Sequence, residues 1–174
     1  MDNNKLNEIL DKHRKWLNGK KGGERADLRY SNLSDSNLSD SDLRYSNLSD
    51  SNLSDSDLRG SSLCYSDLRG SNLSHSNLSD SDLRGSSLCY SDLRDSNLDY
   101  SVWPLWCGSL KAYVDDRIAI QLLYHTLSVV QHSPYVSDEL KRTLLTPGNI
   151  DAANRFHRVN ECGELEVYDN GNTI

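Results

Sequence analysis

The chain has 174 residues, 36% of them hydrophobic, and a formal net charge of −7. This length suits one domain, the negative charge disfavours direct binding to nucleic acid, and no apolar run approaches the roughly 18 residues of a membrane-spanning helix. The first 23 residues lack the apolar core of a secretory signal, so we do not expect one.

A helical cap is predicted for residues 1–23. Apolar side chains recur at helical spacing through residues 4–18, and Gly19 is a natural stop. The stripe consists of Leu6, Ile9, Leu10, His13, Trp16 and Leu17. An open solenoid end would expose apolar side chains and strand edges, so we interpret this helix as a lid on the segment that follows. Its basic face is also compatible with a nucleic-acid patch, but a solvated surface is the simpler interpretation.

Residues 26–100 are fifteen consecutive units of five, each with Leu at its centre. Asp, Asn or Ser precedes that Leu, and Ser begins every unit except the first, which begins with Ala26. A helix repeats its buried face every 3.6 residues and a strand every 2, so a period of five matches neither. Such strict repetition indicates a solenoid, in which each unit buries its Leu only by stacking on its neighbours.

These units resemble the pentapeptide-repeat family, whose consensus is Ala-(Asp/Asn)-Leu-X-X. Every unit matches at the Leu, Ser62 and Ser87 depart at the preceding position, and Ser consistently replaces the first Ala. The resemblance implies a bacterial or phage protein and a mainly β solenoid, a right-handed quadrilateral β-helix with four units per coil. We assign residues 24–105 to this β-helix, which would have just under four coils with residues 20 apart stacked in columns.

The predicted core of the β-helix is the set of central leucines, with Trp103 completing one column. The inward Ser hydroxyls need partners as well, because an unsatisfied buried donor costs about 1–3 kcal/mol. We expect these hydroxyls to bond to one another or to carbonyls. The core set is Leu28, Leu33, Leu38, Leu43, Leu48, Leu53, Leu58, Leu63, Leu68, Leu73, Leu78, Leu83, Leu88, Leu93, Leu98 and Trp103.

Residues 106–174 are predicted to form a C-terminal α-helical subdomain with a frayed tail. The stretch 111–131 is apolar nearly all round and indicates a buried helix. Ser137 is expected to cap a helix over 138–145 that Pro147 and Gly148 end, and Asn149 is expected to cap another over 150–158. The end of the chain contains a brief strand-like segment. By analogy with gyrase-targeting members of the family, these helices are also a candidate homodimer surface.

Two adjoining faces of the predicted β-helix are acidic, and the other two are nearly neutral. One interpretation is that the acidic faces only keep the protein soluble, and the other is that they imitate the charge of DNA and occupy a basic groove. Stacked tyrosines on a near-neutral face are candidate anchors for a protein partner. The candidate surface comprises Asp35, Asp55, Asp92 and Asp95 on one face, Asp40, Asp57, Asp80 and Asp99 on the next, and Tyr45 and Tyr65.

No catalytic, cofactor or metal site is predicted. Asp55, His75 and Asp95 share a column, but an exposed convex row lacks the pocket and the oriented nucleophile that catalysis needs. Cys64, Cys89, Cys107 and Cys162 have no paired spacing and are interpreted as free thiols in a reducing, cytoplasmic compartment. The weakest alternative is a catalytic tail that uses His125, His157 and Cys162.

The sequence therefore predicts a non-enzymatic, rigid protein-interaction scaffold of unassigned role. The alternative is a DNA-mimicking modulator of DNA gyrase or topoisomerase IV, which some members of the family are. A protein partner is expected, and direct contact with nucleic acid or a membrane is not.

Overall fold

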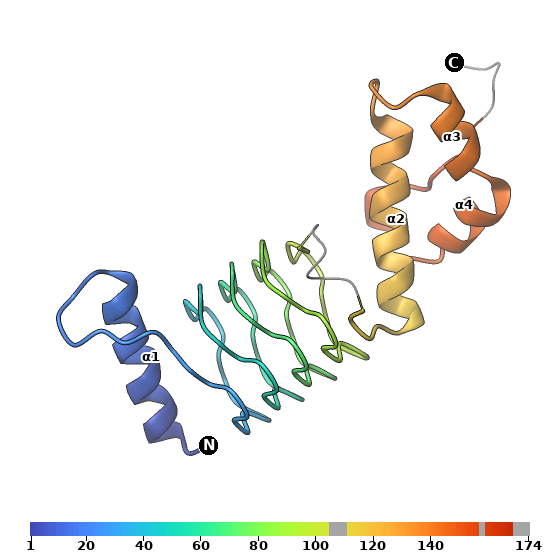
Figure 1. The fold of residues 1–174 in the computed structure, drawn as a ribbon. Coiled ribbons are helices and arrows are strands. Elements are labelled where there is room, and N and C mark those ends of the chain that lie inside the picture. The colour runs from blue at the N-terminus through green and yellow to red at the C-terminus, as the bar shows by residue number, and fades with distance from the viewer. Residues whose placement is uncertain (105–110, 157–158, 169–174) are drawn as a thin grey trace. The chain divides into compact units, whose positions relative to one another are not determined.

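The computed structural model describes residues 1–104, 111–156 and 159–168. The chain divides into two compact units, Met1–Val114 and Asp115–Ile174. The first unit contains helix α1 (Asn3–Leu17) and the stacked coils of the repeat (Figure 1). The predicted cap and the predicted β-helix thus belong to one compact unit.

The coils are joined by parallel β-bridges, one on each face of each layer. All but the last bridge join residues 20 apart, as in Asp27 with Asn47 and Asn32 with Asn52. Twenty residues make one coil, so four units of five form its four faces. The β-solenoid predicted from the five-residue period is confirmed. Each face is too short for a strand longer than one bridge, because a turn follows every Leu.

Each turn begins at a Leu carbonyl, which accepts the backbone N–H of the Ser three residues later. The residue before that Ser has a positive φ, as at Asp55 with φ 59° and Gly60 with φ 64°. This is the type II arrangement, which favours Gly or Asn at that position. Asp, Tyr and His fill most of these positions here, so the turn costs backbone strain that the stacked coils must offset.

The Ser hydroxyl strengthens the same turn. Ser56 Oγ donates to the Leu53 carbonyl at 2.6 Å, which is the acceptor that also receives the Ser56 N–H at 3.2 Å. The same hydroxyl contact recurs at most corners, for example Ser71 to Leu68 at 2.7 Å. Of the two partners expected for the inward hydroxyls, it is the carbonyls that accept them. The Oγ atoms of Ser61 and Ser81 are exceptions, buried without a partner in the described part of the chain.

All fifteen repeat leucines are at most 5% exposed. Trp103 corrects the expectation for the last column. It follows Val102, the bridge partner of Asp82, and so lies in the Leu register, but its side chain is only half-buried. It belongs to the last layer of its column, with no further repeat unit in the sequence to cover it.

The repeat continues on one face beyond the predicted boundary at residue 105. Tyr113 forms a parallel bridge with Asp92, and the Tyr90 N–H donates to the Lys111 carbonyl at 3.0 Å. Residues 111–113 were expected to start a helix. They extend the ladder because Asp115, the N-cap of α2 (Asp116–His132), delays the helix by accepting the Ile118 N–H.

In the second unit, α2 packs against α3 (Asp138–Leu144) and α4 (Pro147–Ala153), and α5 (Val159–Cys162) follows. The buried cluster includes Tyr124, Leu127, Ile150 and Phe156. Helix α2 is buried along one face only, since Val129 is 67% exposed, so the prediction of an apolar helix buried nearly all round was wrong.

The N-cap residue was predicted correctly for one of the two short helices α3 and α4 and wrongly for the other. Ser137 caps α3 as predicted. Thr146, not Asn149, caps α4, and Pro147 begins that helix in addition to following α3. The sequence offers both Thr146 and Asn149, and Pro is favoured at the first helical position, which decides for Thr146. No strand is assigned over 163–168. A frayed tail was also expected at the end of the chain, and its last residues, 169–174, lie outside the described residues.

Candidate interaction surface

The two turn residues of each unit project from the corners of the coils and stack into rows. We name four rows by their first residue. The 30 row is Tyr30, Asp50, Gly70 and Tyr90; the 35 row is Asp35, Asp55, His75 and Asp95; the 40 row is Asp40, Gly60, Asp80 and Tyr100; and the 45 row is Tyr45, Tyr65 and Gly85. Any partner that approaches the repeat from the side meets these rows first.

Every Arg of the repeat binds the Asp two residues before it. Arg59 Nη2 lies 2.5 Å from Asp57 Oδ2, and its Nε lies 2.8 Å from Asp57 Oδ1. This fork geometry matches a carboxylate and holds the pKa of Asp57 below its ordinary value. The other five pairs are Asp27–Arg29, Asp42–Arg44, Asp67–Arg69, Asp82–Arg84 and Asp92–Arg94.

This pairing divides the predicted surface into two classes. Asp57 and Asp92 were expected to contribute to the acidic faces, but an arginine of the same unit neutralises each of them. The carboxylates outside such pairs lie mostly at the corners. We define the acidic stripe as Asp35, Asp55 and Asp95 of the 35 row, Asp40 and Asp80 of the 40 row, and Asp99 beside Tyr100.

Repulsion along the acidic stripe is limited by what lies between the carboxylates. His75 separates Asp55 from Asp95, and its Nε2 lies 3.9 Å from Asp95 Oδ2. Gly60 separates Asp40 from Asp80, and a Cβ there would lie 2.5 Å from Asp40 Oδ1. The Asp40 carboxylate therefore occupies the space that a side chain at position 60 would need. This arrangement keeps like charges about two layers apart in the 40 row.

Aromatic rings run along the 45 row and continue onto the cap. Tyr45 and Tyr65 stack with centroids 5.4 Å apart and planes 7° apart, and Trp16 of α1 meets Tyr45 edge-on at 6.3 Å. At the other end, Gly85 leaves room for the Tyr65 ring, because a Cβ there would lie 2.5 Å from it. The ring faces are largely used within the stack, so a partner would meet ring edges and hydroxyls.

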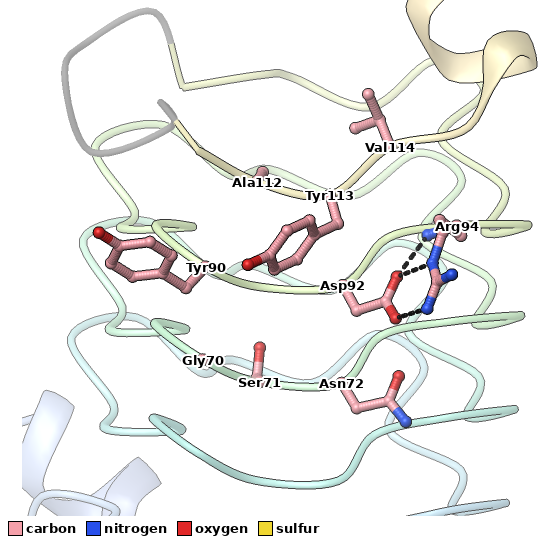
Figure 2. A pocket seen from close by; sticks show the side chains of 9 residues that line it. All are labelled: Gly70, Ser71, Asn72, Tyr90, Asp92, Arg94, Ala112, Tyr113 and Val114. Carbon is pink, nitrogen blue, oxygen red and sulfur yellow. Dashed lines mark hydrogen bonds and ion pairs between the residues drawn. The ribbon is translucent and has the colours of Figure 1, made fainter.

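An open groove of about 720 Å³ lies on the face that includes Asn72 and Asp92 (Figure 2). Tyr90 and Tyr113 line it, and the Asp92–Arg94 pair lies at the end away from Tyr90. Lys111 Nζ lies 3.0 Å from the Tyr90 hydroxyl and 5.2 Å from its ring centroid. Arg94 is followed directly by Asp95, so the groove adjoins the acidic stripe.

Within 115–156 and 159–168, the described part of the second unit, there is no constellation typical of catalysis. The His125 ring contacts the rings of Tyr124 and Phe156, and burial lowers its pKa. Cys162 is exposed, and His157 lies outside the described residues. The described residues contain no group of three His, Cys, Asp or Glu side chains placed to hold a metal. Nor do they include a helix long and apolar enough to cross a membrane.

Two features of this surface were not predicted from the sequence: the Asp–Arg pairs, and the contact of Trp16 with the tyrosines of the 45 row. The first was visible, because each Arg of residues 26–100 follows an Asp by two positions. The second was not, because nothing in the sequence says which corner the cap helix meets.

The family model described as pentapeptide repeats matches residues 24–60 and 66–101. Among curated proteins no sequence matches this chain. The sequence match agrees with the five-residue units and with the coils that they form.

Among solved structures, a pentapeptide repeat protein from the Arabidopsis thaliana thylakoid lumen is 22% identical over 69% of this chain and 74% of that one, with a TM-score of 0.46. A pentapeptide repeat protein from the cyanobacterium Cyanothece is 31% identical over 51% and 60%, with a TM-score of 0.32. QnrB1, a plasmid-mediated fluoroquinolone resistance protein, is 19% identical over 61% and 63%, with a TM-score of 0.20. The family assignment rests on the sequence match and not on these likenesses.

Proposed function

Since this chain is a pentapeptide-repeat protein over residues 24–60 and 66–101, we propose that it is a non-catalytic scaffold that binds a basic surface of a protein partner through the acidic stripe. The observation that carries this proposal is the pairing of all six repeat arginines. The repeat has a net charge of −7, and the pairs cancel six of its thirteen aspartates. Six of the remaining seven form the acidic stripe, so the net charge is concentrated on one side.

The rigidity of the scaffold supports the same function. The backbone ladder fixes the acidic corners, as at Asp55, whose N–H donates to the Ser74 carbonyl at 3.0 Å. A surface that is ordered before binding loses little conformational entropy on association. Complementary charge of this kind contributes mainly to the association rate and to the choice of partner.

A charge-matched comparison tests this proposal. The stripe variant changes Asp35, Asp40, Asp55 and Asp80 to Asn. The control variant makes the same change in net charge elsewhere, with Asp50→Asn, Asp116→Asn, Glu139→Gln and Asp151→Asn. Affinity capture at low salt should retain the same basic protein with the wild type and the control, and lose it with the stripe variant or at higher salt. Equal retention by all three proteins would refute the proposal.

The second candidate function is the modulation of a type II topoisomerase by DNA mimicry, which the resemblance to the family implies. The charge density of the acidic stripe favours it. With layers about 4.8 Å apart, its six carboxylates span about 14 Å, or one charge per about 2.5 Å. Duplex DNA carries one per about 1.7 Å, so the stripe approaches that density over a length of about four base pairs.

A gyrase supercoiling assay separates this candidate from the general one. DNA mimicry predicts inhibition that weakens with salt and is lost in the stripe variant but kept in the control variant. No effect on supercoiling at a large molar excess would exclude gyrase as the partner and leave the general proposal to the capture experiment.

A further inference from the structure

The cap helix is tied to the first coil by a buried imidazole. His13 and Leu6 are the buried residues of α1, and His13 has no exposed surface. Its Nδ1 accepts the backbone N–H of Ala26, the first residue of the repeat, at 3.1 Å. A nitrogen that accepts an N–H cannot carry a proton, so His13 is the neutral tautomer with its proton on Nε2, assigned from this hydrogen bond.

The surroundings of His13 disfavour its charged form. The ring stacks on Trp16 with centroids 5.6 Å apart, and Nε2 is buried without a hydrogen-bond partner among the described residues. Burial lowers the pKa of His13, and the guanidinium groups of Arg25 and Arg44 lower it further, against the opposing effects of the Arg44 backbone and Asp42. Asp42 is itself bound by Arg44 at 2.7 Å, which weakens its influence on the imidazole.

We propose that α1 is an acid-sensitive cap, which leaves the first coil when His13 is protonated. A proton on Nδ1 would replace the acceptor of the Ala26 N–H with a second donor. It would also leave a buried positive charge beside Arg25 and Arg44. The imidazole therefore takes up its proton only in the open state. Opening uncovers the Leu row of the first coil and separates Trp16 from Tyr45. A buried ring nitrogen without a partner is costly for a residue whose only task is packing, which supports a role in switching.

The sign of the pH dependence follows from linkage. In the open state His13 titrates near the ordinary value of about 6.5, whereas in the closed state its pKa is lower. Above about pH 6.5 neither state binds the proton, and docking is independent of pH. Below that value the open state binds more protons, so the open-to-closed ratio rises by up to tenfold for each pH unit. Docking is thus present at neutral pH and lost as the pH falls.

Hydrogen exchange at the Ala26 amide reports on this contact directly. We would measure its protection factor, corrected for intrinsic exchange, from pH 7.5 to 5.0 in the full chain. Three proteins are compared: the wild type, His13→Gln, which keeps an acceptor but cannot titrate, and His132→Gln, which removes an exposed histidine. Protection should fall by up to tenfold per pH unit below about 6.5 in the wild type and in His132→Gln, and stay level in His13→Gln.

A protection factor independent of pH in the wild type, or the same fall in His13→Gln, would overturn the proposal. If His13→Gln shows no protection at any pH, an NMR titration of the wild-type imidazole decides the question. A midpoint that coincides with loss of Ala26 protection supports the switch, and titration of His13 while Ala26 stays protected refutes it.

Discussion

The serine corners allow a test with an internal control. Ser56 and Ser61 occupy successive corners of one coil, and both are at most 2% exposed. Ser56 Oγ donates to the Leu53 carbonyl, whereas Ser61 Oγ has no partner among the described residues. Ser56→Ala removes one neutral hydrogen bond and should lower the free energy of unfolding by about 1 kcal/mol. Ser61→Ala removes a buried hydroxyl that lacks a partner, and should be neutral or stabilising by up to about 1 kcal/mol.

Urea denaturation followed by circular dichroism measures both changes. With a slope of about 2 kcal/mol per molar urea, a loss of 1 kcal/mol moves the midpoint of Ser56→Ala down by about 0.5 M. The midpoint of Ser61→Ala should stay level or rise. The Leu53 carbonyl keeps the Ser56 N–H as a donor in the variant, so a much larger loss is not expected. If both substitutions lower the midpoint equally, the Leu carbonyl contact does not explain the serine at this position.

Three further predictions follow from the corners, the ion pairs and the second unit. Gly85→Ala should destabilise the protein more than Gly19→Ala in thermal unfolding, because both have a positive φ but only the Cβ at 85 would meet a ring, that of Tyr65, at 2.5 Å; equal losses would refute this packing. Arg69 lowers the pKa of Asp67, so stability should be level above about pH 4 and fall below it, and Asp67→Asn or Arg69→Gln should flatten that fall in urea unfolding across pH. Dimerisation through the C-terminal helices predicts that Val129→Glu, on the exposed face of α2, lowers the sedimentation coefficient at high protein concentration; a monomeric wild type would contradict it.

The coils could be predicted from the sequence because the five-residue period and the coil of four units are consistent with each other. The period of five places Leu28 and its successors inward, and a coil of four units brings Asn47 beside Asp27, as the bridges show. The end of the solenoid was harder to place. Residues 111–113 have no central Leu, and they join the ladder through backbone hydrogen bonds that a side-chain pattern does not record.

The candidate surface could be predicted only in part. Sorting charges by face located the acidic side and set Arg59 and Arg94 against the carboxylates of their faces, but it did not pair these arginines with Asp57 and Asp92. The total charge of a face does not say which side chains meet, whereas an ion pair depends on the positions of two particular atoms. The contact between Trp16 and Tyr45 of the 45 row depends on where α1 packs in the folded protein, which the sequence does not tell. His13 was predicted as one apolar-face residue among six, because its hydrogen bond to Ala26 is made only in the folded cap.

Four of the six carboxylates of the acidic stripe owe their position to two kinds of unit in the repeat, while Asp95 lies in an SDLRD unit and Asp99 in SNLDY. Units that contain Asp-Leu-Arg, such as residues 56–60, neutralise their own carboxylate across the turn. In units of the form SNLSD, such as 51–55, Asn takes the second position and its Oδ1 accepts the Ser54 N–H at 3.0 Å, while the Asp moves to the corner. Four units make a coil, so the order of the two kinds decides which corner collects charge. Exchanging one SNLSD unit for SDLRG would therefore remove a corner charge without disturbing the leucine core, and moving units round the coil would move the stripe.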